Sequence, residues 1–167
     1  MRPLVSFQPV PFGDAGALAT LHTMQALVED AKRSPLAVAM VRQLVGVERT
    51  DTPDDVIERI GDWFGERFQF AYDPAPMDRV SSPVLLLQEL AARGVVRGDC
   101  DDAAVLAAFM GSVHGIPYRF RAVGFTPDGP LTHVFSLLRG RAGFIPLDVT
   151  ANAKQVAPAA RRVLDFP

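Results

Sequence analysis

Cysteine is nearly absent from this sequence: Cys100 is the single one among 167 residues. One cysteine excludes an internal disulfide and a multi-cysteine zinc or iron–sulfur site. No stretch approaches the roughly 18 or more apolar residues of a membrane span, and the first residues lack the apolar core of a signal peptide. Charge of one sign is also scarce, because 17 basic residues face 19 acidic ones, for a net charge of −2. We therefore expect a protein of a reducing compartment, cytoplasmic, with neither a nucleic-acid nor a membrane partner.

The composition itself is that of an ordinary globular protein. Apolar residues make up 49% of the sequence and charged residues 22%. A chain of 167 residues is long enough for one sizeable core but too short for two full-sized domains. The sequence therefore predicts a single domain over residues 1–167.

The predicted elements change type half-way along the chain. Helical spacing of apolar residues dominates the first half, where Ser34-Pro35, Thr52-Pro53 and Ser82-Pro83 are typical helix starts. Alternating segments follow in the second half. The expected helices are 14–32, 35–45, 53–68, 83–94 and 100–114, and the expected strands are 118–125, 131–138 and 144–148. Helices followed by antiparallel strands define an α+β fold. Residues 1–13 are expected to form an extended arm that becomes ordered only against a partner.

Cys100 stands at the predicted start of a helix, after Gly98 and Asp99 and before two further aspartates. The free N–H groups and the positive dipole end of a helix stabilise a thiolate, which is the nucleophilic form of cysteine. A lone cysteine is more often just a small buried apolar residue. Its polar setting favours the nucleophile, because a space-filling cysteine would sit more naturally among the alanines that follow.

A thiolate nucleophile needs a base, and the base needs an acceptor that orients it. Of the three histidines, His22 lies on a predicted helix surface, and His114 ends a helix, where a positive charge is favourable in its own right. His133 differs, because it lies on a predicted strand, on the side that we expect to face the core. Asp148 ends the strand predicted to pair with it and could accept the ring N–H. A turn acid that bonds only to nearby backbone is an equally good interpretation of Asp148.

These segments together resemble the transglutaminase-like branch of the papain-like thiol enzymes. The resemblance rests on Gly98-Asp99-Cys100-Asp101-Asp102, then Ile116-Pro117-Tyr118-Arg119-Phe120, then His133-Val134, then Pro146-Leu147-Asp148-Val149-Thr150. It covers roughly residues 53–150 and leaves 1–50 as an arm with extra helices and 151–167 as a tail. Phe144 stands where the family usually has tryptophan. The resemblance implies a papain-like core with Cys100 as nucleophile, His133 as base and Asp148 as orienting acid.

The function implied by the resemblance is thiol-dependent acyl transfer or hydrolysis at an amide bond of a peptide or protein, with no cofactor. Gln69, Tyr72 and Asp99 are candidate oxyanion or substrate-binding residues, beside the backbone N–H of Cys100. The alternative is a structural or adaptor protein that keeps the fold without the activity. Compact members of this shape are often bacteriophage or prophage products. Residues 1–50 could then dock on assembly proteins, and the chain could be virion-associated.

Two further expectations concern metal and charge. A zinc site built from Cys100, His133 and Asp148 would lack the closely spaced second cysteine or histidine of such sites, so no metal is expected. The thiol is expected to form an ion pair with His133 and to react well below its ordinary pKa. The expected core residues are Ile60, Trp63, Phe64, Leu86, Leu90, Leu106, Met110, Phe120 and Phe135.

Overall fold

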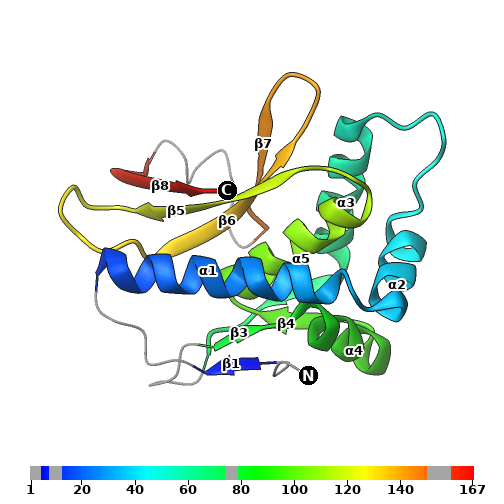
Figure 1. The fold of residues 1–167 in the computed structure, drawn as a ribbon, viewed down its shortest axis with the longest axis horizontal. Coiled ribbons are helices and arrows are strands. Elements are labelled where there is room, and N and C mark those ends of the chain that lie inside the picture. The colour runs from blue at the N-terminus through cyan, green and yellow to red at the C-terminus, as the bar shows by residue number, and fades with distance from the viewer. Residues whose placement is uncertain (1–4, 8–12, 74–78, 150–158) are drawn as a thin grey trace.

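The computed structural model describes residues 5–7, 13–73, 79–149 and 159–167. Within these ranges the chain forms five helices and eight strands, which confirms the mixed helix-and-sheet class (Figure 1). The helices are α1 (Asp14–Ala31), α2 (Pro35–Val45), α3 (Pro53–Arg67), α4 (Pro83–Arg93) and α5 (Cys100–Val113). Each agrees with its predicted range to within a residue or two at either end, because the capping signals fix where helices begin.

The three proline-initiated helices have side-chain caps. Ser34 accepts a hydrogen bond from the Ala37 N–H at 3.3 Å, and Ser82 accepts one from the Leu85 N–H at 3.2 Å. These hydroxyls satisfy helical N–H groups that have no partner inside the helix.

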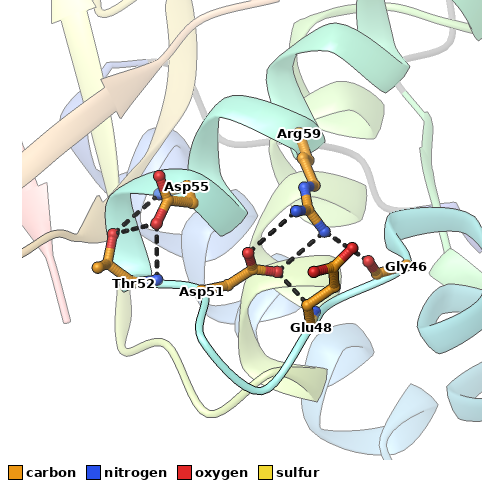
Figure 2. A network of polar contacts seen from close by, with 6 residues as sticks. All are labelled: Gly46, Glu48, Asp51, Thr52, Asp55 and Arg59. Carbon is orange, nitrogen blue, oxygen red and sulfur yellow. Dashed lines mark hydrogen bonds and ion pairs between the residues drawn. The ribbon is translucent and has the colours of Figure 1, made fainter.

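The link between α2 and α3 is closed by a network of polar contacts (Figure 2). Thr52 and Asp55 form a reciprocal capping box at the start of α3, with the Thr52 N–H donating to Asp55 Oδ2 at 2.7 Å. One turn later, Arg59 reaches back across the link to Asp51, with Nη1 2.9 Å from Oδ2, and to the Gly46 carbonyl. The network fixes the angle between two helices that both pack on α5.

A four-stranded antiparallel sheet covers one side of the helices (Figure 1). Its strands are β5 (Tyr118–Gly124), β6 (His133–Arg139), β7 (Phe144–Leu147) and β8 (Arg162–Phe166), in the order β7-β6-β5-β8. The predicted pairing of the His133 strand with the strand before Asp148 is confirmed, since Leu137 lies opposite Pro146. The sequence showed no pattern for β8, which pairs with β5 at the sheet edge.

Helix α5 lies at the centre of the molecule, between the sheet and the other four helices (Figure 1). Its middle is fully buried, with Leu106, Phe109 and Met110 inaccessible to solvent. Ser136 of β6 donates to the Ala104 carbonyl at 2.6 Å, which ties the sheet to this helix. All the core residues expected from the sequence are buried.

Four short strands complete the fold, and the sequence did not indicate them. They are β1 (Val5–Phe7), β2 (Phe68–Phe70), β3 (Arg79–Ser81) and β4 (Val96–Gly98). Strand β1 pairs antiparallel with β3, so this chain itself supplies a partner for part of the predicted arm. The rest of the arm, and residues 150–158 of the tail, lie outside the described residues. Strand β2 pairs parallel with β4, which leads directly into α5.

Candidate active site

Cys100 is the first residue of α5, two residues after the end of β4. The strand brings Gly98 against the side chain of Asp102: a Cβ on Gly98 would lie 2.5 Å from Asp102 Oδ2. No side chain fits in that space, so the glycine is required for the close approach of strand and helix. Asp99 is the N-cap residue but makes no side-chain capping bond. The cysteine is therefore held where a strand turns abruptly into a central helix.

His133 and Asp148 are joined by a short hydrogen bond. His133 Nε2 lies 2.6 Å from Asp148 Oδ2, with the two side chains 13% and 1% exposed. His133 begins β6 and Asp148 follows β7, so the pairing of these two strands brings the residues together. The carboxylate accepts from Nε2 in the tautomer that carries its proton there, which leaves Nδ1 as the basic nitrogen. The contact has the form of a histidine oriented by a carboxylate.

Cys100 lies beside the residue that follows His133. The Val134 backbone N–H donates toward the Cys100 sulfur. Val134 packs in the main core with Cys100, whereas His133 is on the face of β6 that carries Phe135 and a second, smaller apolar cluster. His133 thus shares its face of β6 with the buried Phe135 and Leu137, as expected, and this face carries the smaller of the two core clusters. Cys100 therefore lies against the backbone of β6 at the residue that follows His133.

The electrostatics of the cysteine differ from expectation. Burial raises the pKa of the Cys100 thiol to about 12, the negative charge of Asp101 adds to the increase, and the Val134 N–H opposes it. The expected thiolate with a depressed pKa is therefore contradicted: the resting thiol is protonated at neutral pH. The helix dipole, which lowers the pKa of the thiol, acts only over one turn. Desolvation of the buried sulfur raises that pKa and outweighs the dipole.

Carboxylates crowd the start of α5. One oxygen from each of Asp99, Asp101 and Asp102 lies within 4.8 Å of the others. Asp102 is wholly buried and accepts from the Ser81 N–H at 2.7 Å. Burial, with smaller contributions from Asp99 and Asp73, raises its pKa to about 7. The three aspartates together offer oxygen ligands of the kind that hard divalent cations prefer. The expectation that no metal is bound stays a prediction.

The two remaining candidates lie on or just after β2. Gln69 Oε1 accepts from the Arg97 Nε at 3.2 Å, so its amide is engaged by the neighbouring strand. Tyr72 is 85% exposed, and its ring meets that of Phe70 edge to face, with centroids 4.8 Å apart. The Ala71 N–H donates to the Gly98 carbonyl at 2.8 Å, which continues the parallel pairing up to the entrance of α5. Phe70 was missed by sequence reasoning, although its spacing from Tyr72 along an extended segment was a usable signal.

The other two histidines have separate surroundings. His22 packs edge to face against Phe166, with ring centroids 4.7 Å apart. His114 ends α5, where burial and the neighbouring Arg42 lower its pKa. The expectation of a favourable positive charge at that helix end is therefore wrong for His114. Among the described residues, no helix is long and apolar enough to span a bilayer.

No family model and no curated protein matches the chain. Two solved bacterial structures are similar to it. A "putative protease" from Parabacteroides distasonis superposes with a TM-score of 0.59 at 15% identity, over 78% of this chain and 26% of the other. A "putative cysteine protease" from Cytophaga hutchinsonii superposes with a TM-score of 0.52 at 16% identity, over 95% of this chain and 54% of the other.

These likenesses define the class of fold. This chain spans about a quarter and about half of the lengths of the two similar structures. At such low identity the likeness concerns the fold alone. The chain is a mixed helix-and-sheet protein whose fold is shared with proteins described as proteases.

Proposed function

We propose that the protein is a papain-like, transglutaminase-like thiol enzyme that attacks an amide or peptide bond. Cys100 is the nucleophile, His133 the base and Asp148 the acid that orients the base. The observation that carries the proposal is the 2.6 Å bond between His133 Nε2 and Asp148 Oδ2, at a strand end whose next backbone N–H points at the Cys100 sulfur. Thiol acyl transfer requires a thiol and a histidine that can take its proton, with the histidine oriented by an acceptor such as a carboxylate.

The raised thiol pKa determines how the reaction begins. Cys100 enters as a neutral thiol, and His133 Nδ1 takes its proton as the sulfur attacks the carbonyl carbon. The C–N bond then breaks, and the protonated histidine delivers that proton to the leaving amine. A thioester remains on Cys100, and water or a second amine resolves it. Asp148 keeps the ring in the tautomer that presents Nδ1 and stabilises the imidazolium.

Two backbone groups are suited to stabilise the oxyanion. The N–H of Cys100 itself lies close to its sulfur, as does that of Val134. Backbone donors at a helix start need no reorganisation when charge develops on the carbonyl oxygen. The side chain of Gln69 is less suited to this role, because Arg97 holds its amide oxygen.

The proposal is tested with a mixed fluorogenic peptide library and mass spectrometry of the acylated protein. Cys100→Ala is expected to abolish both turnover and acylation. His133→Ala should lower turnover at least about a hundredfold, and Asp148→Asn should lower it by a similar order.

Matched controls separate catalysis from folding. His22 and Asp128 are exposed residues outside the site, and His22→Ala and Asp128→Asn should retain turnover close to wild type. Urea midpoints should confirm that all variants are folded. Turnover that survives in Cys100→Ala would refute the proposal. The docking of residues 1–50 on assembly proteins stays a prediction.

A further inference from the structure

Two exposed aromatic rings form a contact pair beside the nucleophile. Tyr72 is 85% and Phe70 is 44% exposed, and their rings meet edge to face. Large aromatic side chains contribute most when buried, so an exposed pair has no role in packing the core. The pair lies at the surface, on and just after β2.

The backbone pairing places these rings at the entrance of α5. Phe70 lies directly opposite Gly98 in the parallel pair of β2 and β4. The Ala71 N–H bonds to the Gly98 carbonyl, so the segment that carries Tyr72 continues alongside the turn into Cys100. The aromatic pair therefore lies on and just after the strand next to the one that leads into Cys100.

The same entrance is negatively charged. Asp99 and Asp101 lie at the start of α5 beside the buried Asp102, and Asp73 follows Tyr72 in the chain and acts electrostatically on Asp102. Of the nearby arginines, Arg79 Nε is 3.8 Å from Asp73 Oδ1, and Arg97 bonds to the neutral Gln69. In the part of the chain that the structure describes, Asp99 Oδ1 has no hydrogen-bond partner. An excess of carboxylates attracts cations and repels anions.

We propose that the Phe70–Tyr72 pair holds a lysine or arginine side chain of the peptide substrate, next to the amide that Cys100 attacks. This inference rests on the proposed function and adds the substrate class. The aliphatic stem of the side chain packs on the rings, and its charged end interacts with their π faces and with the surrounding field of the aspartates. An acidic residue at the same position meets unfavourable charge, and an apolar residue gains only the packing.

The test compares peptides that differ at one residue beside the scissile bond: arginine, lysine, norleucine, glutamine or glutamate. Norleucine matches the lysine stem without its charge. Binding is measured by calorimetry on Cys100→Ala, which needs no catalysis, and cleavage is measured on the wild type. We expect the arginine and lysine peptides to bind about five- to twentyfold tighter than the norleucine peptide, and the glutamate peptide to bind weakest.

The preference should depend on the rings. In the Cys100→Ala background, Tyr72→Ala should reduce the preference for arginine over norleucine to about twofold or less, whereas Tyr72→Phe should keep most of it. Phe125→Ala is the matched control, because Phe125 is also 44% exposed but lies after β5.

Three results would overturn the inference. Equal or tighter binding of norleucine would assign the pair to apolar side chains. A preference that survives Tyr72→Ala but disappears with added calcium would assign it to the aspartates alone. Equal binding by all five peptides would remove the subsite. Each of these can occur while Cys100 is still acylated, so a failure here is distinct from a failure of the proposed function, which would appear as absent acylation.

Discussion

The buried carboxyl of Asp102 should make the stability of the protein depend on pH. Its side chain is fully buried, and burial, together with the charges of Asp99 and Asp73, raises its pKa to about 7. In the unfolded chain the pKa of an aspartate is about 3.9. The folded protein therefore binds one proton more than the unfolded chain between these two values. The contribution of Asp102 to stability is then greatest below about pH 4 and falls as pH rises toward 7.

The size of the effect follows from the difference between the two pKa values. One pKa unit corresponds to about 1.4 kcal/mol, so the whole shift amounts to about 4 kcal/mol of unfolding free energy. Between pH 5 and pH 8 the loss acts over about two units, or about 3 kcal/mol. Asp102→Asn does not titrate, and its amide oxygen can still accept from the Ser81 N–H, whose bond to Asp102 is 2.7 Å.

Urea unfolding at pH 5, 6, 7 and 8 tests this reasoning. The wild type should lose about 3 kcal/mol relative to Asp102→Asn across the series. His114 titrates in both proteins, so its contribution cancels in the difference. Asp128→Asn, an exposed change, should follow the wild-type profile. Parallel profiles for wild type and Asp102→Asn would refute the argument, because they would show that Asp102 is charged in the folded protein at pH 5.

Three further predictions follow from the core and the thiol. Leu106→Ala should lower the unfolding free energy by about 2 to 5 kcal/mol, because Leu106 is inaccessible to solvent; a urea midpoint equal to wild type would contradict this. Ser136→Ala should cost about 1 to 3 kcal/mol, because it leaves the buried Ala104 carbonyl without its 2.6 Å bond, and unchanged thermal unfolding would argue against that bond. Iodoacetamide should alkylate Cys100 slowly at pH 7 and faster in Asp101→Asn, since Asp101 raises the thiol pKa; equal rates would show that Asp101 does not act on the sulfur.

Local signals in the sequence were enough to predict the helices and the main strands. Proline after a capping hydroxyl marks a helix start by itself, as Ser34 and Ser82 do. The contact between His133 and Asp148 was also predictable, because one short turn connects their strands and fixes which residues meet. These features depend on residues that are close to one another in the sequence, within one helix start or one hairpin.

The features that could not be predicted depend on distant segments. The parallel pairing of β2 with β4 joins strands separated by α4, and β8 acquires its place only by pairing with β5. The thiol pKa depends on how deeply α5 is buried, which no local pattern reports. The sequence could not tell which of two core clusters the face of His133 would join, because both faces of β6 are apolar, with a cluster on each side.

The central position of α5 has a consequence for how the protein is made. The helix packs on α1, which comes early in the chain, and on β6, which comes late. Contacts between such distant segments form slowly, because the chain must lose the entropy of closing a long loop before the contacts can stabilise it. While the chain is being synthesised, Cys100 emerges from the ribosome well before His133 and Asp148. A partly synthesised chain therefore carries a thiol without its base, and the proposed activity can arise only after the β6–β7 hairpin has docked.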